Sequence, residues 1–341
     1  MTCKPISVLF IWQPDEELRQ YLAEGLNRRP DVRLVYPSDT KEETFYELAS
    51  EADIIIGWRP TKELLAQAEK LKLFINPGAG VQHLIEIFRE HNAKHDVTVI
   101  NGHGNAYFAA QHAVALLMAV TNKIVQHHNW MAAGRWRLGD EEAASVPVRG
   151  RHIGLLGYGA INQNVHRFLS GFDVEFAICR RAWEGKPEPA IRYKKKYDIT
   201  QLHDFLTAID TLMIAVPHTP ETEGMISKVE LELLGRNGLL INVGRGKIVE
   251  EEALFTALEQ KIIAGAGIDV WYDYKAPPDE KGERHPASFP FHKLDNIVMS
   301  PHRAASPFSD LKRWDEVVEN IRRLADDETE FLNVVQLDRE Y

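Results

Sequence analysis

The chain has 341 residues, of which 44% are hydrophobic and 26% charged, a composition typical of a globular protein with two domains of ordinary size. Its formal net charge of −10 argues against a nucleic-acid partner, and its two cysteines, Cys3 and Cys179, cannot form a disulfide framework. Because the N-terminus lacks a signal-peptide layout and no apolar run approaches the ~20 residues of a membrane span, we expect a cytoplasmic protein with no membrane partner.

The first hundred residues alternate short apolar runs with helical patterns. The apolar runs are typical of buried strands, and the segments between them repeat their apolar residues at helical spacing. Alternating strands and helices predict a parallel sheet with helices on its faces, which is an α/β architecture. The expected strands are residues 6–12, 32–36, 52–57, 72–76 and 97–100.

A long apolar pattern at 106–128 predicts one helix that is too hydrophobic to lie on a surface. Residues 129–150, rich in Trp, Gly and charge, resemble a connecting or interface arm. The proline-rich segment 271–295 is expected to be a loop, and 306–327 a final helix. Further buried strands are expected at 209–216, 238–243, 263–270 and 296–300.

The most informative motif is HIGLLGYGAIN at 152–162, followed by VEFAICRR at 174–181. A strand that enters a glycine-rich turn, a helix and a second strand is the pattern of a dinucleotide-binding βαβ unit. Gly157 allows the tight turn, and Gly159 leaves room for a pyrophosphate at the helix N-terminus. The third position of the G-x-G-x-x-G pattern is occupied by Asn162.

The end of the second strand indicates which cofactor binds. NAD sites usually place an acidic residue there for the ribose 2′-hydroxyl, but this chain has Arg180 and Arg181. A guanidinium can hold a 2′-phosphate, which a carboxylate would repel. The sequence therefore favours NADP, with NAD still possible. Alternatively, the two arginines only cap an exposed strand end.

Three polar residues follow predicted strands, where open parallel sheets bind ligands: Arg245, Asp269 and His302. Each alone has an ordinary structural explanation, as a solvated cation or a satisfied polar group. Together, an arginine and a histidine suit carbonyl reduction, because Arg can hold a carboxylate and His can move a proton near neutral pH. The loop at Gly78–Gly80 could offer backbone N–H groups to a small anion, although it is also an ordinary strand-to-helix turn.

With these motifs, the chain resembles the D-isomer-specific 2-hydroxyacid dehydrogenases over nearly its whole length. The matching stretches are NPGAGVQHL, NGHGNAYFAAQHAVALLMAV, GRHIGLLGYGAINQNVHRFLSGF, AVPHTPETEGMIS, LLINVGRGKIVEEEALFTAL, AGAGIDVW and NIVMSPHRAA. The resemblance implies two Rossmann-like, doubly wound parallel-sheet domains, with the cofactor domain inserted into the substrate domain. The flavodoxin-like substrate domain would be 1–105 plus 306–341. The NAD(P) domain would be 106–305, with an arm near 129–150 that makes a homodimer.

The resemblance also implies roles for individual residues. Arg245 corresponds to the substrate-orienting arginine, and His302 to the catalytic acid/base. The backbone of Ala79 and Gly80 would hold the substrate carboxylate, and His103 could touch substrate. The expected cofactor-binding residues are Gly157, Gly159, Ala160, Ile161, Arg180, Arg181, Val216, Pro217, Thr222, Val243, Gly244, Asp269 and Ala304.

One position departs from the family pattern. Members usually carry a glutamate five residues after the aspartate of the DV motif, where it orients the catalytic histidine and raises its pKa; this chain has Tyr274 there. Three interpretations remain open. Asp273 or Glu280 replaces the glutamate, which is the interpretation we favour; Tyr274 orients His302 through its hydroxyl; or His302 has no such partner.

The leading functional hypothesis is an NADPH-linked reductase of small 2-oxo acids, with glyoxylate or hydroxypyruvate as the natural substrates to consider. One alternative is a dehydrogenase of another small anion on the same fold, such as formate. Another is a nucleotide-sensing binding protein of the corepressor type. We expect no metal site, because no histidine or cysteine cluster has metal-ligand spacing.

Overall fold

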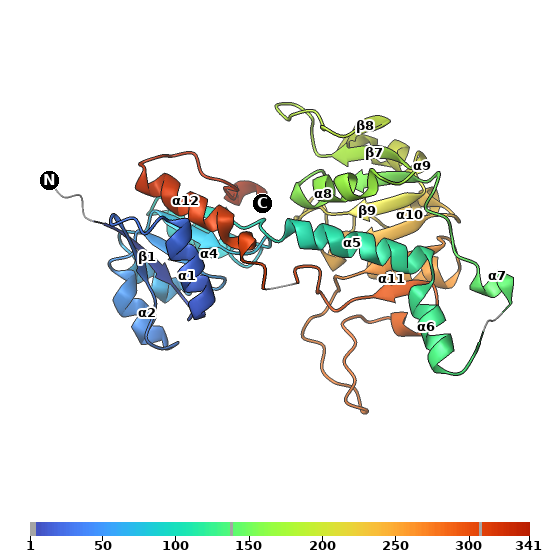
Figure 1. Cartoon of the computed structure of the whole chain (residues 1–341), viewed down its shortest axis with the longest axis horizontal. Helices are drawn as coiled ribbons and strands as arrows, with labels where there is room; N and C mark the ends of the chain where they lie inside the picture. Colours follow the sequence, from blue (N-terminus) through green and yellow to red (C-terminus); the bar gives the residue numbers. More distant parts are fainter. Residues whose placement is uncertain (1–4, 137–138, 307–308) are drawn as a thin grey trace. The chain divides into compact units, whose positions relative to one another are not determined.

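The computed structural model describes residues 5–136, 139–306 and 309–341 and divides into two compact units (Figure 1). The first unit is Met1–Asn105 with Pro307–Tyr341, and the second is Ala106–Ser306. The second unit is thus inserted into the sequence of the first. Cys3, residues 137–138 of the predicted arm and residues 307–308 of the predicted last helix lie outside the described residues.

Within the described residues, the first unit contains a five-stranded parallel sheet in the order β2-β1-β3-β4-β5. This is the flavodoxin-like order, in which the strand sequence reverses at β1. The strands are β1 (Ile6–Phe10), β2 (Val32–Val35), β3 (Ile54–Ile56), β4 (Leu73–Asn76) and β5 (Thr98–Asn101). The helices are α1 (Glu16–Gly25), α2 (Glu42–Ala49), α3 (Lys62–Gln67), α4 (Ile85–Asn92) and α12 (Asp315–Ala325), with 3-10 turns at Leu311–Trp314 and Leu337–Arg339.

The second unit has a seven-stranded parallel sheet among its described residues, in the order β12-β11-β10-β9-β6-β7-β8. Six of these strands, from β8 to β11, follow the dinucleotide-binding Rossmann order, and the order reverses at β6. The strands are β6 (His152–Leu156), β7 (Glu175–Arg180), β8 (Lys195–Asp198), β9 (Thr211–Ile214), β10 (Leu239–Asn242), β11 (Gly265–Ile268) and β12 (Ile297–Met299). The helices are α5 (Ala106–Thr121), α6 (Ile124–Ala132), α7 (Asp140–Ala143), α8 (Ala160–Leu169), α9 (Leu202–Thr207), α10 (Lys228–Leu234) and α11 (Glu251–Glu259), with 3-10 turns at Ile199–Gln201, Gly246–Ile248 and Phe291–Lys293.

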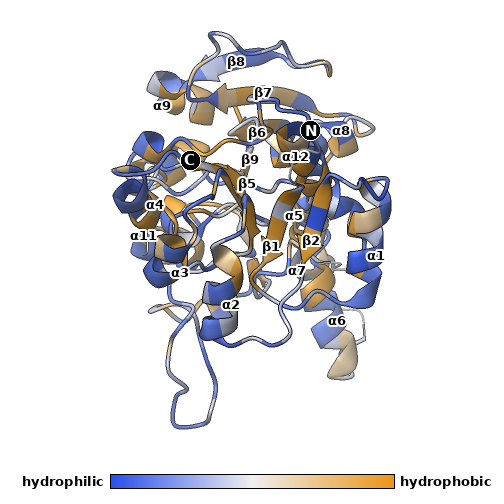
Figure 2. Ribbon diagram, turned by 90° about the vertical axis from the view of Figure 1, so that its left-hand side faces the viewer, coloured by the Kyte–Doolittle hydropathy of each residue, from blue (hydrophilic) through white to orange (hydrophobic). Residues whose placement is uncertain are grey.

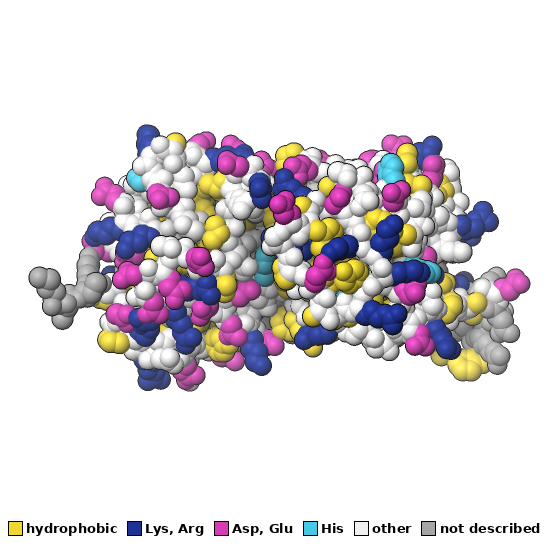
Figure 3. Space-filling view, turned by 90° about the horizontal axis from the view of Figure 1, so that it is seen from above, with side chains coloured by type: hydrophobic (Ala, Val, Ile, Leu, Met, Phe, Trp, Pro, Cys, Tyr) yellow, Lys and Arg dark blue, Asp and Glu magenta, His cyan; other side chains and the backbone are white. Residues whose placement is uncertain are grey.

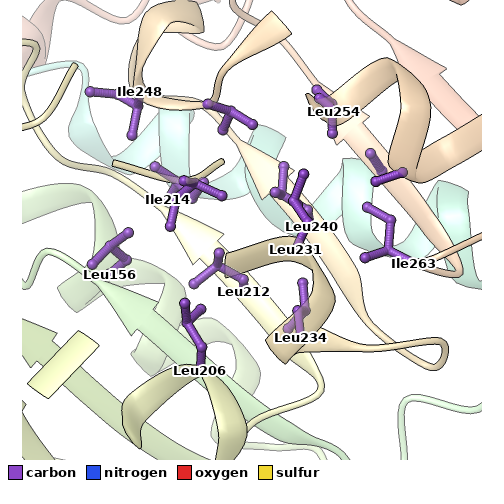
Figure 4. Close-up of a cluster of buried hydrophobic side chains, with 14 of the residues drawn as sticks. Leu156, Leu206, Leu212, Ile214, Leu231, Leu234, Leu240, Ile248, Leu254 and Ile263 are labelled. Atoms are coloured by element: carbon purple, nitrogen blue, oxygen red, sulfur yellow. The ribbon is translucent and has the colours of Figure 1, made fainter. Parts of the chain in front are cut away.

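Both faces of the second sheet are covered, and this explains why its central strands read as continuous apolar runs. Leu155 packs with α5 and α8 on one face, whereas its neighbour Leu156 belongs to the cluster under α9, α10 and α11 on the other. Figure 4 shows this second cluster around Leu212, Ile214 and Leu240. The predicted fold class, two doubly wound parallel sheets, is confirmed.

Several boundaries differ from the predictions. The pattern at 106–128 is not one helix, because Lys123 takes a left-handed conformation (φ 49°) and separates α5 from α6. The buried half of the pattern is α5, whereas α6 has no buried residue. The expected last helix begins as a 3-10 turn at Leu311 and becomes α-helical only at Asp315. No single helix among the described residues is long and apolar enough to cross a membrane, and only the bent pair of α5 and α6 passes such a test when both are taken together.

Strand β8 was not predicted. Its sequence, KKYD, is charged, and it lies at the edge of the sheet, where it pairs with β7 alone. Figure 2 shows the contrast between the hydrophobic β7 and the hydrophilic β8. Charged side chains suit an edge strand, since they discourage pairing with other chains. On the face shown in Figure 3, basic and acidic side chains are interspersed across the surface.

Candidate active site

The glycine-rich turn after β6 has the geometry that a bound dinucleotide requires. Gly157 has φ +80°, and a Cβ there would lie 2.7 Å from Val216 Cγ1 and 2.8 Å from the Ala215 carbonyl oxygen. Only glycine fits that position. Gly159 precedes α8, and a Cβ there would meet no atom within 4 Å. This space lies beside Ala160 and Ile161, the first residues of α8, whose N–H groups have no acceptor within the helix.

Asn162, at the usual position of the third glycine, is a structural residue. Its side chain is 1% exposed, and Nδ2 lies within hydrogen-bond distance of the carbonyl oxygens of Leu156 (3.1 Å), Gly157 (2.7 Å) and Met213 (3.2 Å). The amide therefore ties α8 to the ends of β6 and β9. The Asn162 side chain is tolerated in place of glycine because its buried amide nitrogen has hydrogen-bond acceptors.

Arg180 lies directly beside this turn, because the N–H of Gly157 donates to the carbonyl of Cys179 (2.8 Å). Its guanidinium is 5.3 Å from the Trp183 ring centroid, and burial lowers its pKa, although an arginine remains charged at any physiological pH. Arg181 is exposed and pairs with Glu221 (3.2 Å). Of the two, Arg180 is better placed to meet a phosphate, since no ion pair engages it among the described residues.

Two loops meet at the ends of β9 and β10. In the first, Thr222 Oγ1 donates to the Pro217 carbonyl (2.7 Å) and accepts the N–H of Thr219 (2.9 Å). The second loop, which begins at the buried Val243, passes close by: a Cβ on Gly244 would lie 2.9 Å from the Val216 carbonyl oxygen. The predicted residues Val216, Pro217, Thr222, Val243 and Gly244 are thus held together at one edge of the sheet.

Arg245 is positioned by the buried Asn242. The Asn242 amide accepts the N–H of Gly244 and donates to the Arg245 carbonyl, both at 3.0 Å. Arg245 Nη1 in turn donates to the Gly244 carbonyl (2.7 Å). Burial lowers the pKa of Arg245, and its guanidinium makes no other hydrogen bond among the described residues, so most of its donors are available to an anion.

His302 sits in a left-handed turn (φ 55°), a conformation that a non-glycine residue adopts only when its surroundings enforce it. The enforcing group is Asp269, whose carboxylate is 0% exposed. It accepts the Ser300 hydroxyl, the N–H of Arg303 (2.7 Å) and the N–H of Ala304 (2.9 Å). Asp269 therefore fixes Ser300, Arg303 and Ala304, the residues on either side of His302.

A histidine on α5 completes this network. His112 Nε2 lies 2.9 Å from Ser300 Oγ and 3.4 Å from Asp269 Oδ1. Burial would raise the pKa of Asp269, but hydrogen bonds from His112, Ser300 and the two backbone amides outweigh it and hold the pKa below its usual value. Asp269 was expected to contact the cofactor; in this structure its carboxylate is occupied with the His302 turn, and the expected contact stays a prediction.

Tyr274 does not orient His302 through its hydroxyl. The hydroxyl oxygen accepts the N–H of Trp271 (3.1 Å), and it is the ring that contacts His302, with centroids 5.3 Å apart. The replacement carboxylates are not there either: Asp273 accepts the N–H of Lys275, and among the described residues neither Asp273 nor Glu280 bonds to the imidazole. Of the three interpretations, the structure supports the third, in which His302 has no carboxylate partner among the described residues.

The electrostatics of His302 follow from this arrangement. Burial and then the positive charge of Arg245 lower the pKa of His302, while the charge of Asp269 opposes them. Burial likewise raises the pKa of Tyr274, with the charge of Arg245 opposing it. These couplings place Arg245, Tyr274 and His302 within electrostatic range of one another at the carboxyl edge of the second sheet.

In the first unit, two asparagines orient the loop after β4. The Asn76 side chain donates to the carbonyls of Gly78 and Gly80, and the Asn101 side chain donates to that of Ala79 (2.9 Å). In a trans peptide the N–H points opposite to the C=O. Pinning the carbonyls of Gly78 and Ala79 therefore aims the N–H groups of Ala79 and Gly80 away from the asparagines, and neither donates to an acceptor among the described residues.

His103 lies in the same unit after β5. Its backbone N–H donates to the Glu316 carboxylate (2.7 Å), and burial lowers its pKa while Glu316 opposes the shift. Its predicted contact with substrate stays a prediction.

One group of side chains among the described residues lies at metal-ligand distances, although it is not a histidine or cysteine cluster. Asp279, Glu283 and His285 each offer a ligand atom within 4.8 Å of the others. Asp279 Oδ1, however, accepts the N–H groups of Lys281 and Glu283, as in an ordinary exposed turn. The proximity alone indicates no metal site.

The reversal of strand order at β6, the turn at Gly157 and the opening beside Gly159 define a dinucleotide-binding α/β protein. The comparisons specify it further. The family model for the NAD binding domain of D-isomer specific 2-hydroxyacid dehydrogenases matches residues 114–304. The chain therefore belongs to the D-isomer specific 2-hydroxyacid dehydrogenase family, and it is a nicotinamide-dependent oxidoreductase.

Curated relatives agree with this assignment, and a solved structure shows the same fold. A glyoxylate/hydroxypyruvate reductase of Arabidopsis thaliana is 31% identical over 262 residues, which cover 76% of this chain and 74% of that protein. A formate dehydrogenase of Chaetomium thermophilum is 30% identical over 300 residues, covering 84% and 78%. The structure of a D-isomer specific 2-hydroxyacid dehydrogenase from Xanthobacter autotrophicus, in complex with NADPH and MES, matches the fold with a TM-score of 0.76 at 24% identity, over 99% and 100% of the two chains.

The sequence reasoning missed the residues that support the predicted ones. Asn76, Asn101, Asn242, His112 and Ser300 each hold a loop that carries a candidate site residue. The available signal was their position: all but His112 end a strand or follow it directly, where side chains face the ligand edge of a parallel sheet.

Proposed function

We propose that the protein is an NADPH-linked reductase of small 2-oxo acids of the glyoxylate or hydroxypyruvate type. The observation that carries the proposal is the grouping of Arg245 and His302 at the edge of the sheet that bears the dinucleotide turn. The curated relatives named as glyoxylate reductases support the substrate class.

Two sets of groups in this chain suit a 2-oxo acid. In the first unit, the N–H groups of Ala79 and Gly80 suit a carboxylate. In the second, Arg245 can hold a carboxylate and polarise the C2 carbonyl, and the protonated His302 ring can donate a proton to the C2 oxygen. A bound nicotinamide would supply the hydride. Tyr274 keeps the imidazole in place through its ring.

The choice of NADPH rests on Arg180. A guanidinium beside the turn, stacked on Trp183 and free of an acidic partner among the described residues, suits a 2′-phosphate. Arg181 adds positive charge but already pairs with Glu221. Several structural neighbours contain NADP or NADPH.

We also propose a cytoplasmic homodimer built through the segment that begins at α6. Ile124, Val125, Met131 and Trp136 are 43–77% exposed, and such an exposed apolar set is typical of a protein interface. Light scattering coupled to size-exclusion chromatography tests this. Wild type should elute with the mass of a dimer and Met131→Asp with that of a monomer; a monomeric wild type would contradict the proposal.

The activity is tested by mixing the purified protein with NADPH and a panel of 2-oxo acids and following NADPH oxidation. We expect turnover, and we expect His302→Ala and Arg245→Ala to lose it while still binding NADPH. Formate with NADP⁺ or NAD⁺ serves as a parallel reaction, since formate dehydrogenases are among the relatives. Tight NADPH binding without turnover of any acid would support the nucleotide-sensing alternative instead.

A further inference from the structure

His166 is a buried histidine for which the proposed reaction has no use. It lies on α8, is 0% exposed, and its ring contacts that of Phe176 with centroids 4.2 Å apart. Nδ1 lies 2.8 Å from the hydroxyl oxygen of Tyr158, and Nε2 lies 3.1 Å from the carbonyl oxygen of Arg192. Burial lowers the pKa of His166 and favours the neutral ring. Because a carbonyl can only accept, Nε2 carries the proton and Nδ1 accepts the Tyr158 hydroxyl.

These two hydrogen bonds join two parts of the chain that would meet different parts of a dinucleotide. Tyr158 is the middle residue of the glycine-rich turn after β6, where the pyrophosphate is expected. Arg192 lies near the end of the segment 181–194, which connects β7 to β8 and begins directly after Arg180. His166 therefore fastens this segment to the glycine-rich turn.

The start of the segment 181–194 supports the guanidinium that is proposed to hold the 2′-phosphate. The Trp183 ring centroid lies 5.3 Å from Arg180 Cζ, and Trp183 Nε1 donates to the Tyr197 carbonyl (2.8 Å). Trp183 and Tyr193 also pack on the hydrophobic cluster that includes Tyr158. A shift of the segment would therefore move the indole on which the Arg180 guanidinium stacks.

We propose that His166 is a positioning residue for recognition of the 2′-phosphate of NADPH, acting through the segment that carries Trp183. By holding the Arg192 carbonyl, it keeps the segment against the turn and the indole beside Arg180, so that the guanidinium stays in place for the phosphate. The inference rests on the NADPH preference in the proposed function. NADH lacks the 2′-phosphate, so its binding does not depend on this placement.

This difference between the two cofactors provides the test. The Kd values for NADPH and NADH are measured by fluorescence titration in wild type and variants. His166→Phe keeps a buried ring but loses both hydrogen bonds, and we expect it to raise the Kd for NADPH about tenfold and that for NADH less than about twofold. His166→Gln, whose amide can still donate to the Arg192 carbonyl, and Tyr158→Phe, which leaves that bond intact, should both keep the ratio of the two Kd values within about threefold of wild type.

Val165→Ala is the matched control. Val165 precedes His166 on α8 and is buried in the same cluster, but its side chain forms no hydrogen bond. The control should lower the melting temperature and leave the Kd ratio unchanged.

An equal rise of both Kd values in His166→Phe would overturn the proposal, because His166 would then only support the fold of the turn. No change in either value, or a wild type that binds NADH as tightly as NADPH, would also overturn it. The titrations need no substrate acid. A ratio that changes in His166→Phe alone therefore supports the inference even if no 2-oxo acid is reduced, a result that would contradict only the proposed reaction.

Discussion

Replacing Tyr274 by glutamate should move the pH dependence of the reductase reaction. In this structure the His302 imidazole contacts the Tyr274 ring, and burial and Arg245 lower its pKa from the ordinary value of 6.5. Reduction uses the protonated imidazole, so the kcat/KM of wild type should fall as the pH rises through a value below about 6.5. A carboxylate at position 274 favours the protonated ring and shifts the fall upward.

The size of the shift follows from the geometry. At 5.3 Å, the separation of the two ring centroids, opposite unit charges attract by roughly 3 kcal/mol at an effective dielectric constant of ~20, and by less than about 1 kcal/mol in water. Tyr274 is 57% exposed, so solvent screens a charge there and an intermediate value applies. We expect Tyr274→Glu to raise the pKa of His302 by about one unit, which corresponds to ~1.4 kcal/mol.

The assay is a pH profile of kcat/KM for NADPH-dependent reduction. Tyr274→Gln is the matched control, because it has the size of glutamate without the charge, and Tyr274→Phe keeps the ring contact. In both variants, kcat/KM should still fall as the pH rises at low pH values, as in wild type. A wild-type limb above about pH 7.5, or equal profiles for the glutamate and glutamine variants, would refute this account of an unpaired His302.

Three further perturbations address the supporting residues. Asn162→Gly removes the buried amide that donates to carbonyls of β6, the glycine-rich turn and β9 and places glycine in α8, so the free energy of unfolding in urea should drop by about 2 kcal/mol; a drop under about 0.5 kcal/mol would contradict its structural role. Changing Arg180 and Arg181 to serine should raise the KM for NADPH about 30-fold and leave that for NADH unchanged; equal effects would mean that they only cap the strand. Ser300→Ala removes the hydroxyl that lies between His112 and Asp269 and should lower kcat about tenfold at an unchanged Kd for NADPH; a matching rise in Kd would instead indicate cofactor binding.

The fold could be predicted because both sheets are covered on two faces. Their central strands are continuous apolar runs, and the helices between them repeat apolar residues at helical spacing. The break at Lys123 could not be predicted, since a single left-handed residue leaves no mark on the apolar pattern. Strand β8 was missed because a charged edge strand lacks the apolar signal on which strand prediction depends.

The candidate site was predictable to a lesser degree. Arg245 and His302 follow strands, so topology alone brings them to one edge of the sheet. What surrounds His302 depends on long-range contacts: the loop that follows β11 determines where Tyr274 lies, and local sequence does not encode its ring contact. Trp12 and Trp314 likewise stack on each other from opposite ends of the chain, with ring centroids 5.7 Å apart, and no spacing in the sequence indicates this contact.

The central claim is that Arg245 and His302 act as a reductase pair for 2-oxo acids with NADPH. The most direct measurement is NADPH oxidation by wild type and His302→Ala in the presence of glyoxylate, hydroxypyruvate or 2-oxobutyrate, with NADPH binding measured in parallel. The account predicts turnover by wild type, a loss of more than about 100-fold in His302→Ala, and equal NADPH binding by both. Turnover that survives the substitution, or its absence in a wild type that binds NADPH, would contradict it.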